Sequence, residues 1–498
     1  MNVLQLGPDN WAKKYEIPKS IDWEFNNYPP EEKHNYNVVI ISGENHLSDQ
    51  DWETLQWRVD PYNVIYLPGA LIHLSPAAKH FLRCQAATEN LDDPQTIINN
   101  LPRQYFWGQS GIRFAPSSLM LLTDRLQFIH YLDAGHLLLK ADTNDEWVNI
   151  GSYKNNIFLD PNRLIKLWLE YQTQNIEIRL RVFLQYSGGD GDPNDSFILN
   201  IDSLNEVQLP IKFTDSVRYV NISVEVRGNG SLKLGVLHSR WSREGKGEFI
   251  TGGQRIVNPS NREDVAVYFN PGDLKPPLNV YFSGARGLEG FEAFPLFRNL
   301  HAPTILVTDM RLEVGQFYTT SYMEEEIKKF ICYYLDKLGF NKKQLIMNGI
   351  SMGTYPAMKL GAQLGAYAIN VAKPLANLGL IAKRGRLERP EGFETIFDMD
   401  NQLVTHLKRT DLDQLDQNFW HAFNHCDLSQ TRLFVGYMEN DDYDNQAIEY
   451  LRQSPAVAKA KQFATKGFAG RHNDDPSINS WFVGRLTQML KYDFGRDD

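Results

Sequence analysis

Residues 345–364, LIMNGISMGTYPAMKLGAQL, decide how the last part of this chain folds. The apolar run 345–347 is typical of a buried strand, and residues 354–364, with a proline in the first turn, are typical of a helix. Between them residues 349–353, GISMG, match G-x-S-x-G, a sharp strand-to-helix turn that exposes the serine hydroxyl. The turn needs glycines because the two backbones crowd it. We predict that Ser351 is a nucleophile at such an elbow; the alternative is a tight turn without catalytic function.

Two partners that a nucleophilic serine requires follow it in the chain. The serine needs a histidine to take its proton, and the histidine needs an acid, in the order serine, acid, histidine for this type of elbow. The apolar run 431–438 leads into an acidic loop, where we predict Asp441 as the acid. His472, in a loop before an amphipathic last helix, is the predicted base, with a surface histidine as the alternative. Three further carboxylates of the acidic loop stay open as the acid: Glu439, Asp442 and Asp444.

Donors for a developing oxyanion are predicted at two places. The backbone N–H of Met352, directly after the nucleophile, is the first. The second is expected from residues 283–287, SGARG, which follow an apolar run at 278–282. Ala285 is the predicted donor among several amides of this loop. These groups together describe acyl-transfer chemistry.

The 498 residues divide into three regions with different patterns, about the number of domains expected for this length. We predict an N-terminal α/β domain at residues 1–170, an all-β sandwich at 171–265 and an α/β-hydrolase-like catalytic domain with a parallel sheet at 266–498. In the first region the predicted elements are strands at 37–42 and 64–67 and helices at 74–85 and 162–171. In the second they are strands at 176–184, 196–201, 207–213, 217–226 and 232–237. In the third they are strands at 278–282, 304–307, 344–348 and 431–438 and helices at 321–338 and 354–364.

Composition excludes several classes of function. A net charge of -10 and a pI near 5.7 argue against a protein that binds nucleic acid through a basic surface. The three cysteines are scattered, which argues against a disulfide framework and a structural zinc site and favours a reducing compartment. We predict a cytoplasmic protein, because the N-terminus lacks an apolar signal region and no window is apolar enough for a membrane span. No phosphate loop, metal motif or tightly bound cofactor is indicated.

Two features outside the predicted active site have alternative interpretations. Residues 190–195, DGDPND, begin like a calcium loop but lack its later glycine and glutamate, so we interpret them as a polar turn. Trp241, with Arg240 and Arg243 on either side and His238 nearby, has the aromatic and polar groups of a sugar-binding surface. An edge-strand cluster is the alternative.

With these residues in place, the chain resembles the accessory Sec system family that acts on serine-rich repeat adhesins of Gram-positive bacteria. Several motifs carry the resemblance in order over nearly the full length: NVVIISGENHLSDQDW (37–52), GVLHSRWSREGKGEFITGGQRI (235–256), YFSGARGLEGFEAFP (281–295), NGISMGTYPAMKLGAQLGAYA (348–368), GYMENDDYDNQA (436–447) and GFAGRHNDD (467–475). Separate motifs in a fixed order are more specific than the elbow alone.

The resemblance implies a cytoplasmic protein that works with two other accessory secretion proteins and an accessory SecA-type motor to export a glycosylated adhesin, meeting the membrane only through these partners. It also implies O-acetylation of N-acetylglucosamine on the adhesin, from a donor that stays open, by a triad at Ser351, Asp441 and His472. The acid of relatives can be glutamate, so aspartate is a departure here. A secretion scaffold without catalysis and a plain carbohydrate esterase are the competing hypotheses.

Overall fold

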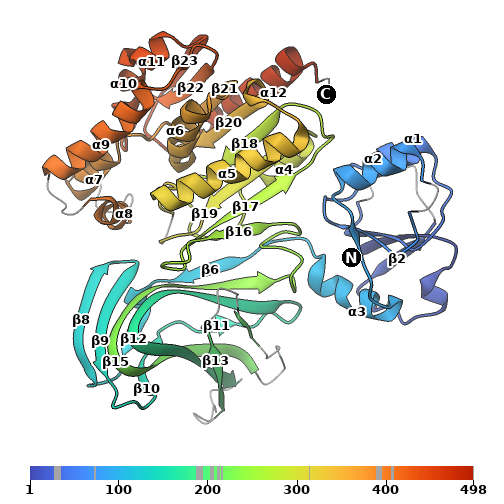
Figure 1. The fold of residues 1–498 in the computed structure, drawn as a ribbon, viewed down its shortest axis with the longest axis horizontal. Coiled ribbons are helices and arrows are strands. Elements are labelled where there is room, and N and C mark those ends of the chain that lie inside the picture. Colours follow the sequence, from blue (N-terminus) through green and yellow to red (C-terminus); the bar gives the residue numbers. More distant parts are fainter. Residues whose placement is uncertain are drawn as a thin grey trace.

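The chain folds into three units, and the computed structural model in Figure 1 shows how they meet. The N-terminal unit, in blue, flanks a bent β-sheet unit in cyan and green and a C-terminal unit in yellow to red. The structure describes residues 1–26, 35–71, 74–186, 195–201, 207–209, 214, 217–312, 315–387, 395–404 and 409–496.

The N-terminal unit is a five-stranded parallel sheet in the order β2-β1-β3-β4-β5. Its strand β3 is buried on both faces: Val39 and Ile41 pack on one side, Val38 and Ile40 on the other. The predicted strands and the helix at 74–85 are confirmed, because short apolar runs suit a parallel sheet covered on both faces. The elements are β1 (Asn2–Leu6), η1 (Trp11–Lys13), β2 (Asp22–Phe25), β3 (Val38–Ile41), α1 (Asp49–Leu55), β4 (Val64–Tyr66), α2 (Pro76–Cys84), β5 (Thr88–Glu89) and α3 (Pro94–Gln104).

Two very long strands, β12 (Leu164–Tyr186) and β15 (Val217–Ser242), form the spine of the β-sheet unit. They pair antiparallel along most of their length, and β15 also pairs in turn with β11, β10, β9 and β6. The result is one ten-stranded sheet that curls round its own core, where the sequence predicted a sandwich of separate short strands (Figure 1). The strands predicted at 217–226 and 232–237 are both parts of β15.

The predicted helix at 162–171 is wrong, because these residues begin β12. Ile165, Leu167 and Leu169 face the core of the bent sheet. Trp168 is also buried, and its indole N–H donates to the carbonyl of Arg262 in the C-terminal unit at 2.8 Å. A strand buried on both faces has no period of two, so it cannot be told from a buried helix by its pattern.

The bent sheet also begins earlier than the predicted boundary at residue 170, since strands from residue 111 onward pair within it. Residues 190–194 of the calcium-like segment lie outside the described residues. The remaining elements of the unit are β6 (Gly111–Phe114), η2 (Pro116–Ser118), β7 (Leu119–Leu121), β8 (Leu126–Asp133), β9 (His136–Asp142), β10 (Val148–Tyr153), β11 (Ile157–Phe158), β13 (Ser196–Asn200) and β14 (Val207–Gln208).

The C-terminal unit is built on an eight-stranded sheet in the order β16-β17-β19-β18-β20-β21-β22-β23. The strands from β19 to β23 along this order are parallel, whereas β17 runs antiparallel to both its neighbours. Helices cover both faces: Val280 of β18 packs in the core that includes α5 and α6, and Tyr281 in the core that includes α4 and α12. Because these strands are parallel, their carboxyl ends meet at one edge of the sheet, where the predicted site residues follow β18, β20, β22 and β23.

The strands and helices predicted in the C-terminal unit are confirmed, with β16 and β17 added partly before the predicted boundary at 266. Fully buried apolar side chains on α5, such as Ile327 and Ile331, contribute about 1.5–3 kcal/mol each to its docking. The elements are β16 (Gln254–Val257), β17 (Asp264–Asn270), β18 (Leu278–Phe282), α4 (Phe294–Asn299), β19 (Thr304–Asp309), α5 (Ser321–Leu338), η3 (Lys342–Gln344), β20 (Leu345–Ile350), η4 (Ser351–Gly353), α6 (Thr354–Leu364), β21 (Ala368–Ala372), α7 (Leu378–Leu387), α8 (Ile396–Leu403), α9 (Arg409–Asn424), β22 (Arg432–Met438), α10 (Ala447–Gln453), α11 (Pro455–Ala458), β23 (Gln462–Phe468) and α12 (Ser477–Phe494).

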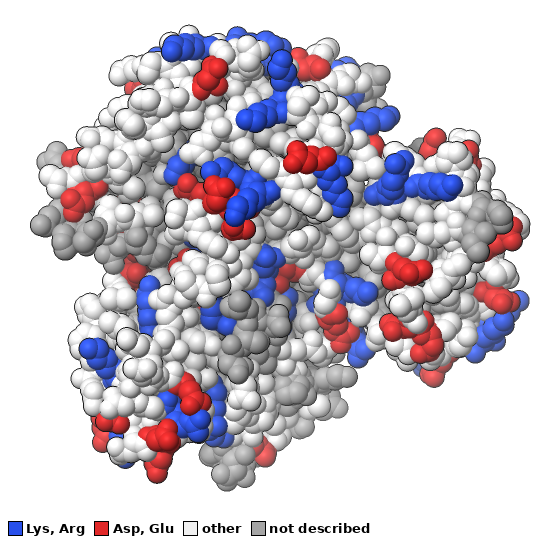
Figure 2. Space-filling view, viewed as in Figure 1, with Lys and Arg blue, Asp and Glu red and all other residues white. Residues whose placement is uncertain are grey.

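Surface charge is mixed on the face shown in Figure 2, where basic and acidic side chains lie interspersed over all three units. None of the helices in the described part of the chain combines the length and the apolar character that a membrane crossing requires.

Candidate active site

Ser351 stands at the turn between β20 and α6, as the motif predicted. Its φ of 55° lies in the left-handed region, which costs free energy for a residue with a side chain. Two hydrogen bonds of Thr354 stabilise the turn: its hydroxyl donates to the carbonyl of Ser351 at 2.6 Å and accepts the N–H of Leu375 at 2.8 Å. The strained serine is therefore fixed at the carboxyl edge of the sheet.

Two glycines make room for this turn. A Cβ at Gly353 would lie 2.0 Å from the carbonyl oxygen of Phe282, and one at Gly349 would lie 2.2 Å from the carbonyl oxygen of Gly353. Both contacts are with backbone, which cannot rotate away as a flexible side chain can. The glycines of the motif are therefore steric requirements of the elbow.

We expect Gly353→Ala to destabilise the protein by about 1–3 kcal/mol, because the added methyl group forces α6 away from β18. Gly484→Ala is the matched control: it lies in α12 with no atom within 4 Å of an added Cβ, so it should be neutral or stabilising by about 0.5–1 kcal/mol. Denaturant unfolding of both variants measures the difference. A Gly353 variant as stable as the wild type would contradict the steric argument.

The three residues predicted as a triad lie in one hydrogen-bonded line. Ser351 Oγ is 2.9 Å from His472 Nε2, and His472 Nδ1 is 2.8 Å from Asp441 Oδ2. His472 lies in the loop between β23 and α12, and Asp441 lies in the turn after β22. Both side chains are almost fully buried, at 3% and 4% exposure, whereas Ser351 is half-buried. Distant parts of the chain are thus brought together in a geometry that allows proton transfer from serine to histidine.

Asp441 is held as an anion. Burial alone would raise the pKa of this carboxyl, but the hydrogen bond and charge of His472 and the N–H groups of Tyr443 and Asp444 outweigh burial and lower it. A carboxylate at Nδ1 places a proton on that nitrogen, which leaves Nε2 free to accept the proton of Ser351. The ring of Tyr443 packs edge-on against the imidazole, with centroids 4.7 Å apart, and helps to fix its plane.

The other carboxylates of the acidic loop have different positions. Asp442 accepts the backbone N–H of His472 at 3.0 Å and so supports the loop rather than the ring. Asp444 is buried and accepts the N–H groups of Ala376 and Asn377, both at 2.8 Å; burial raises its pKa. Glu439 is exposed. Among the four carboxylates that the sequence left open, the ring of His472 binds Asp441.

The segments that hold the predicted oxyanion donors both come close to the serine. Met352 begins the turn into α6, and Gly284 lies so close that an added Cβ would be 3.9 Å from the Cβ of Ser351. The N–H of Gly284 donates to Glu292 Oε2 at 2.8 Å, so that amide is engaged and Ala285 remains the predicted second donor. Sequence reasoning gave no role to Glu292, because its partner is a backbone amide and no spacing rule identifies such a bond.

The cluster of Arg240, Trp241 and Arg243 lies between units. Arg240 and Arg243 are 1% and 2% exposed, and Arg243 donates to the carbonyls of Phe106 and Gly108 in the connection between the first two units. The hypothesis that these arginines bind a sugar is wrong, because they are buried and bonded within the protein.

Fold and site together define a mixed α/β protein of three units that carries a hydrogen-bonded serine, histidine and aspartate at the edge of its largest parallel sheet. Comparison with known proteins is more specific. A profile of the family "Accessory Sec system GspB-transporter" matches residues 1–496, and this chain belongs to that family. The family resemblance expected from the sequence motifs is confirmed.

Relatives are similar over the whole chain. An accessory Sec system protein of Streptococcus gordonii is 34% identical over 510 residues, which cover 100% of this chain and 99% of the relative. One from Staphylococcus aureus is 38% identical over 402 residues, covering 80% of this chain and 76% of the relative. Among solved structures, a chain of the Glycosylation Associate Protein (Gap123) complex from Streptococcus agalactiae superposes with a TM-score of 0.89 at 31% identity, covering 100% of this chain and 99% of that chain. The three-unit arrangement is therefore shared with that structure.

Proposed function

We propose that this protein is a serine-dependent O-acetyltransferase of the accessory Sec system, which acetylates N-acetylglucosamine on a serine-rich repeat adhesin. The observation that carries the proposal is the line from Ser351 Oγ through the ring of His472 to Asp441, at 2.9 Å and 2.8 Å. The order of the site residues along the sheet supports an α/β-hydrolase-like fold. The serine follows β20, the acid follows β22 and the histidine follows β23, which are the fifth, seventh and eighth of the eight strands in chain order.

In the first half-reaction Ser351 Oγ attacks the carbonyl carbon of an acetyl donor while His472 Nε2 takes the hydroxyl proton. The oxygen of the tetrahedral intermediate is stabilised by the N–H groups of Met352 and Ala285. Collapse breaks the bond to the leaving group, which takes the proton from His472. Asp441 stabilises the imidazolium that exists between these two transfers.

In the second half-reaction a sugar hydroxyl attacks the acetyl-Ser351 ester. His472 takes the hydroxyl proton, the same N–H groups hold the oxyanion, and collapse breaks the bond to Ser351 Oγ, which regains the proton. The acetylated sugar then leaves. Water in place of the sugar gives hydrolysis, which is the reaction of a plain carbohydrate esterase.

A second function, that of a secretion scaffold, is favoured by similarity over the whole chain to a component of the Gap123 complex. We propose that the protein assembles with two other accessory secretion proteins. The family resemblance adds an accessory SecA-type motor and the adhesin as partners. Assembly and catalysis can coexist, because the three residues of the triad lie at one edge of the C-terminal sheet.

Trapping the acyl-enzyme tests the proposed chemistry. Protein mixed with p-nitrophenyl acetate and quenched in acid is expected to carry one acetyl group on the peptide that contains Ser351, as measured by mass spectrometry. Addition of a glycopeptide bearing N-acetylglucosamine should move the acetyl group to the sugar. Absence of both acetyl-Ser351 and p-nitrophenol release would rule out serine catalysis, and release by water alone, with no transfer, would favour the esterase.

A further inference from the structure

The loop of residues 283–292 begins with the stretch 283–287 that is expected to supply the second oxyanion donor. This loop is attached to the β-sheet unit as well as to its own unit. Gln109, just before β6, clamps Phe291: its Nε2 donates to the carbonyl at 2.7 Å, and its Oε1 accepts the N–H at 2.8 Å. The N–H of Glu289 donates to the carbonyl of Gly111 at 3.0 Å. Backbone groups at two positions of the loop are therefore fixed by the neighbouring unit.

Glu289 also inserts a fully buried carboxylate into the β-sheet unit. Arg113 Nε and Arg240 Nε donate to it at 3.2 Å and 2.6 Å, and His238 Nδ1 lies 2.5 Å from Oε1. Arg113 Nη1 also donates to the carbonyl of Arg286 at 2.9 Å. Arg286 directly follows Ala285, the predicted oxyanion donor. Truncating one partner of a buried ion pair leaves an uncompensated charge, so these contacts hold the loop firmly.

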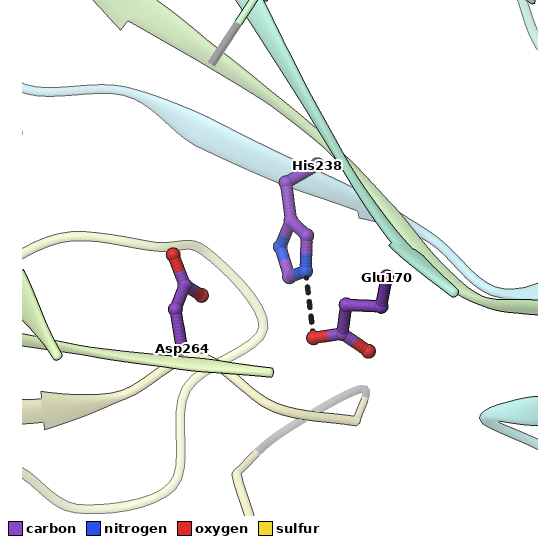
Figure 3. Close-up of side chains that lie close together, drawn as sticks. All are labelled: Glu170, His238 and Asp264. Carbon is purple, nitrogen blue, oxygen red and sulfur yellow. Dashed lines mark hydrogen bonds and ion pairs between the residues drawn. The ribbon is translucent and has the colours of Figure 1, made fainter. Parts of the chain in front are cut away.

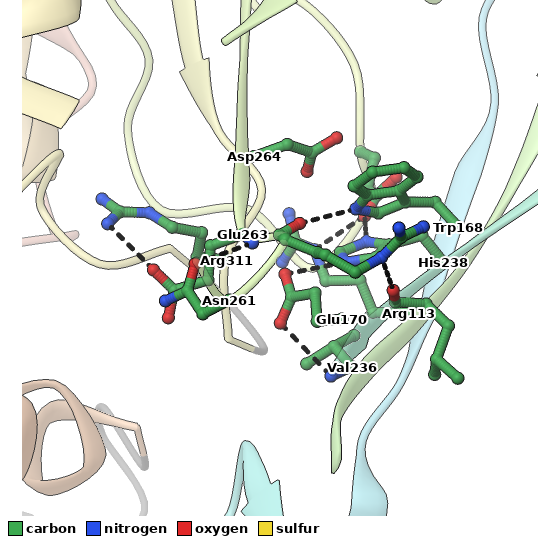
Figure 4. A network of polar contacts seen from close by, with 12 residues as sticks. Arg113, Trp168, Glu170, Val236, His238, Asn261, Glu263, Asp264 and Arg311 are labelled. Atoms are coloured by element: carbon green, nitrogen blue, oxygen red, sulfur yellow. Dashed lines mark hydrogen bonds and ion pairs between the residues drawn. The ribbon is translucent and has the colours of Figure 1, made fainter. Parts of the chain in front are cut away.

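The charges around Glu289 belong to a larger buried network between the two units. His238 bonds to Glu289 through Nδ1 and to Glu170 through Nε2, which is 3.0 Å from Glu170 Oε1. Figures 3 and 4 show the side chains of His238 and Glu170. Burial lowers the pKa of His238, but the attraction of Glu289 and the hydrogen bonds to both carboxylates outweigh burial and raise it to about 9. A protonated His238 therefore donates to a carboxylate on each side at neutral pH.

Glu170, His238 and Asp264 place atoms of metal-ligand type within 4.8 Å of one another (Figure 3). Asp264, however, already accepts both terminal nitrogens of Arg240, at 2.7 Å and 3.0 Å, and also binds Arg255. A cation would have to displace a guanidinium there. The cluster is thus better understood as a network of ion pairs that fixes how the units dock.

The opposite end of the loop reaches the active site. Glu292 accepts the N–H of Gly284 at 2.8 Å and the hydroxyl of Tyr281 at 3.0 Å, which places Gly284 beside Ser351. Within the loop, Arg286 Nη1 donates to the carbonyl of Gly290 at 2.9 Å. The amide of Ala285 thus lies on a segment anchored in its own unit at one end and in the β-sheet unit at the other.

We propose that docking of the β-sheet unit sets the conformation of this oxyanion loop, with Gln109 and Glu289 as positioning residues for chemistry at Ser351. The proposal rests on the proposed acyl-transfer function. The β-sheet unit is then part of the catalytic apparatus. If a partner protein changed the contact between the β-sheet unit and the C-terminal unit, the turnover rate would change.

The test compares two glutamines that bridge the same pair of units. Gln109→Ala removes both bonds to Phe291 and is expected to lower, by about tenfold, the kcat for p-nitrophenyl acetate and the rate at which a fluorophosphonate labels Ser351. KM and the melting temperature should stay near the wild-type values. Gln172→Ala is the matched control, because Gln172 donates to the carbonyl of Ser260 across the same interface and neither residue belongs to the loop. This variant should leave kcat, KM, the labelling rate and the melting temperature unchanged.

Glu289→Gln provides a second variant, which should slow labelling at least as much if it folds; Gln109→Ala decides the matter if it does not. Slower labelling of Gln109→Ala with an unchanged Gln172→Ala supports the positioning role. Labelling of Gln109→Ala at the wild-type rate overturns the inference while leaving the proposed function intact. A wild-type protein whose Ser351 is not labelled at all overturns both.

Discussion

Replacing Ser351 with alanine is expected to lower the rate of acyl transfer by about 10⁴- to 10⁶-fold, the range found when a catalytic serine is lost. The substitution removes the only atom that forms the covalent bond, while the donors of the oxyanion site stay in place. Stability should change by no more than about 0.5 kcal/mol, since the side chain is half-buried and shrinks by one atom. Turnover of p-nitrophenyl acetate and the melting temperature measure the two effects.

The same variant separates catalysis from secretion in cells. Ser480→Ala is the matched control, because Ser480 is an exposed serine of α12 in the same unit. Loss of adhesin acetylation with export intact would mean that the two functions are separate. Loss of both in a folded protein would mean that export depends on acetylation. Acetylation that persists in Ser351→Ala would exclude the triad.

The C-terminal unit could be predicted from the sequence because its information is local and ordered. Strand, elbow and helix around Ser351 carry their own signals, and the acid and the histidine follow in the order that the sheet requires. The choice of Asp441 among four carboxylates was harder. It depends on which side chain turns towards the ring of His472, and Asp444, three residues further along, is as buried as Asp441 but binds backbone amides instead.

The bent sheet shows where local patterns fail. The pattern of residues 162–171 favours a helix because β12 is buried on both faces there, one against the sheet's own core and one against the C-terminal unit. The bonds of Gln109, Glu289 and Glu292 were also missed. Their partners are backbone groups or charges that the fold brings from other positions in the chain, and such pairs cannot be predicted from composition or local pattern.

Asp441→Asn is expected to lower kcat at neutral pH by about 10⁴-fold with little change in KM. Asparagine keeps the shape of aspartate but carries an amide nitrogen, which donates to Nδ1 of His472 and so leaves the proton on Nε2. That nitrogen then faces Ser351 Oγ as a donor and cannot take its proton. The amide also gives no charge to stabilise the imidazolium. Steady-state kinetics of the folded variant measure the loss.

Asp442→Asn is the control, because Asp442 accepts the backbone N–H of His472, and the amide oxygen of asparagine can still accept it. Its kcat should stay within about a few-fold of the wild type, since a neutral acceptor replaces a charged one at a supporting position. A similar loss in both variants would mean that the charge of the loop, rather than the bond from Asp441 to the ring, governs the reaction. A loss confined to Asp441→Asn identifies Asp441 as the acid of the triad, because both substitutions replace one carboxylate oxygen by an amide nitrogen at neighbouring positions.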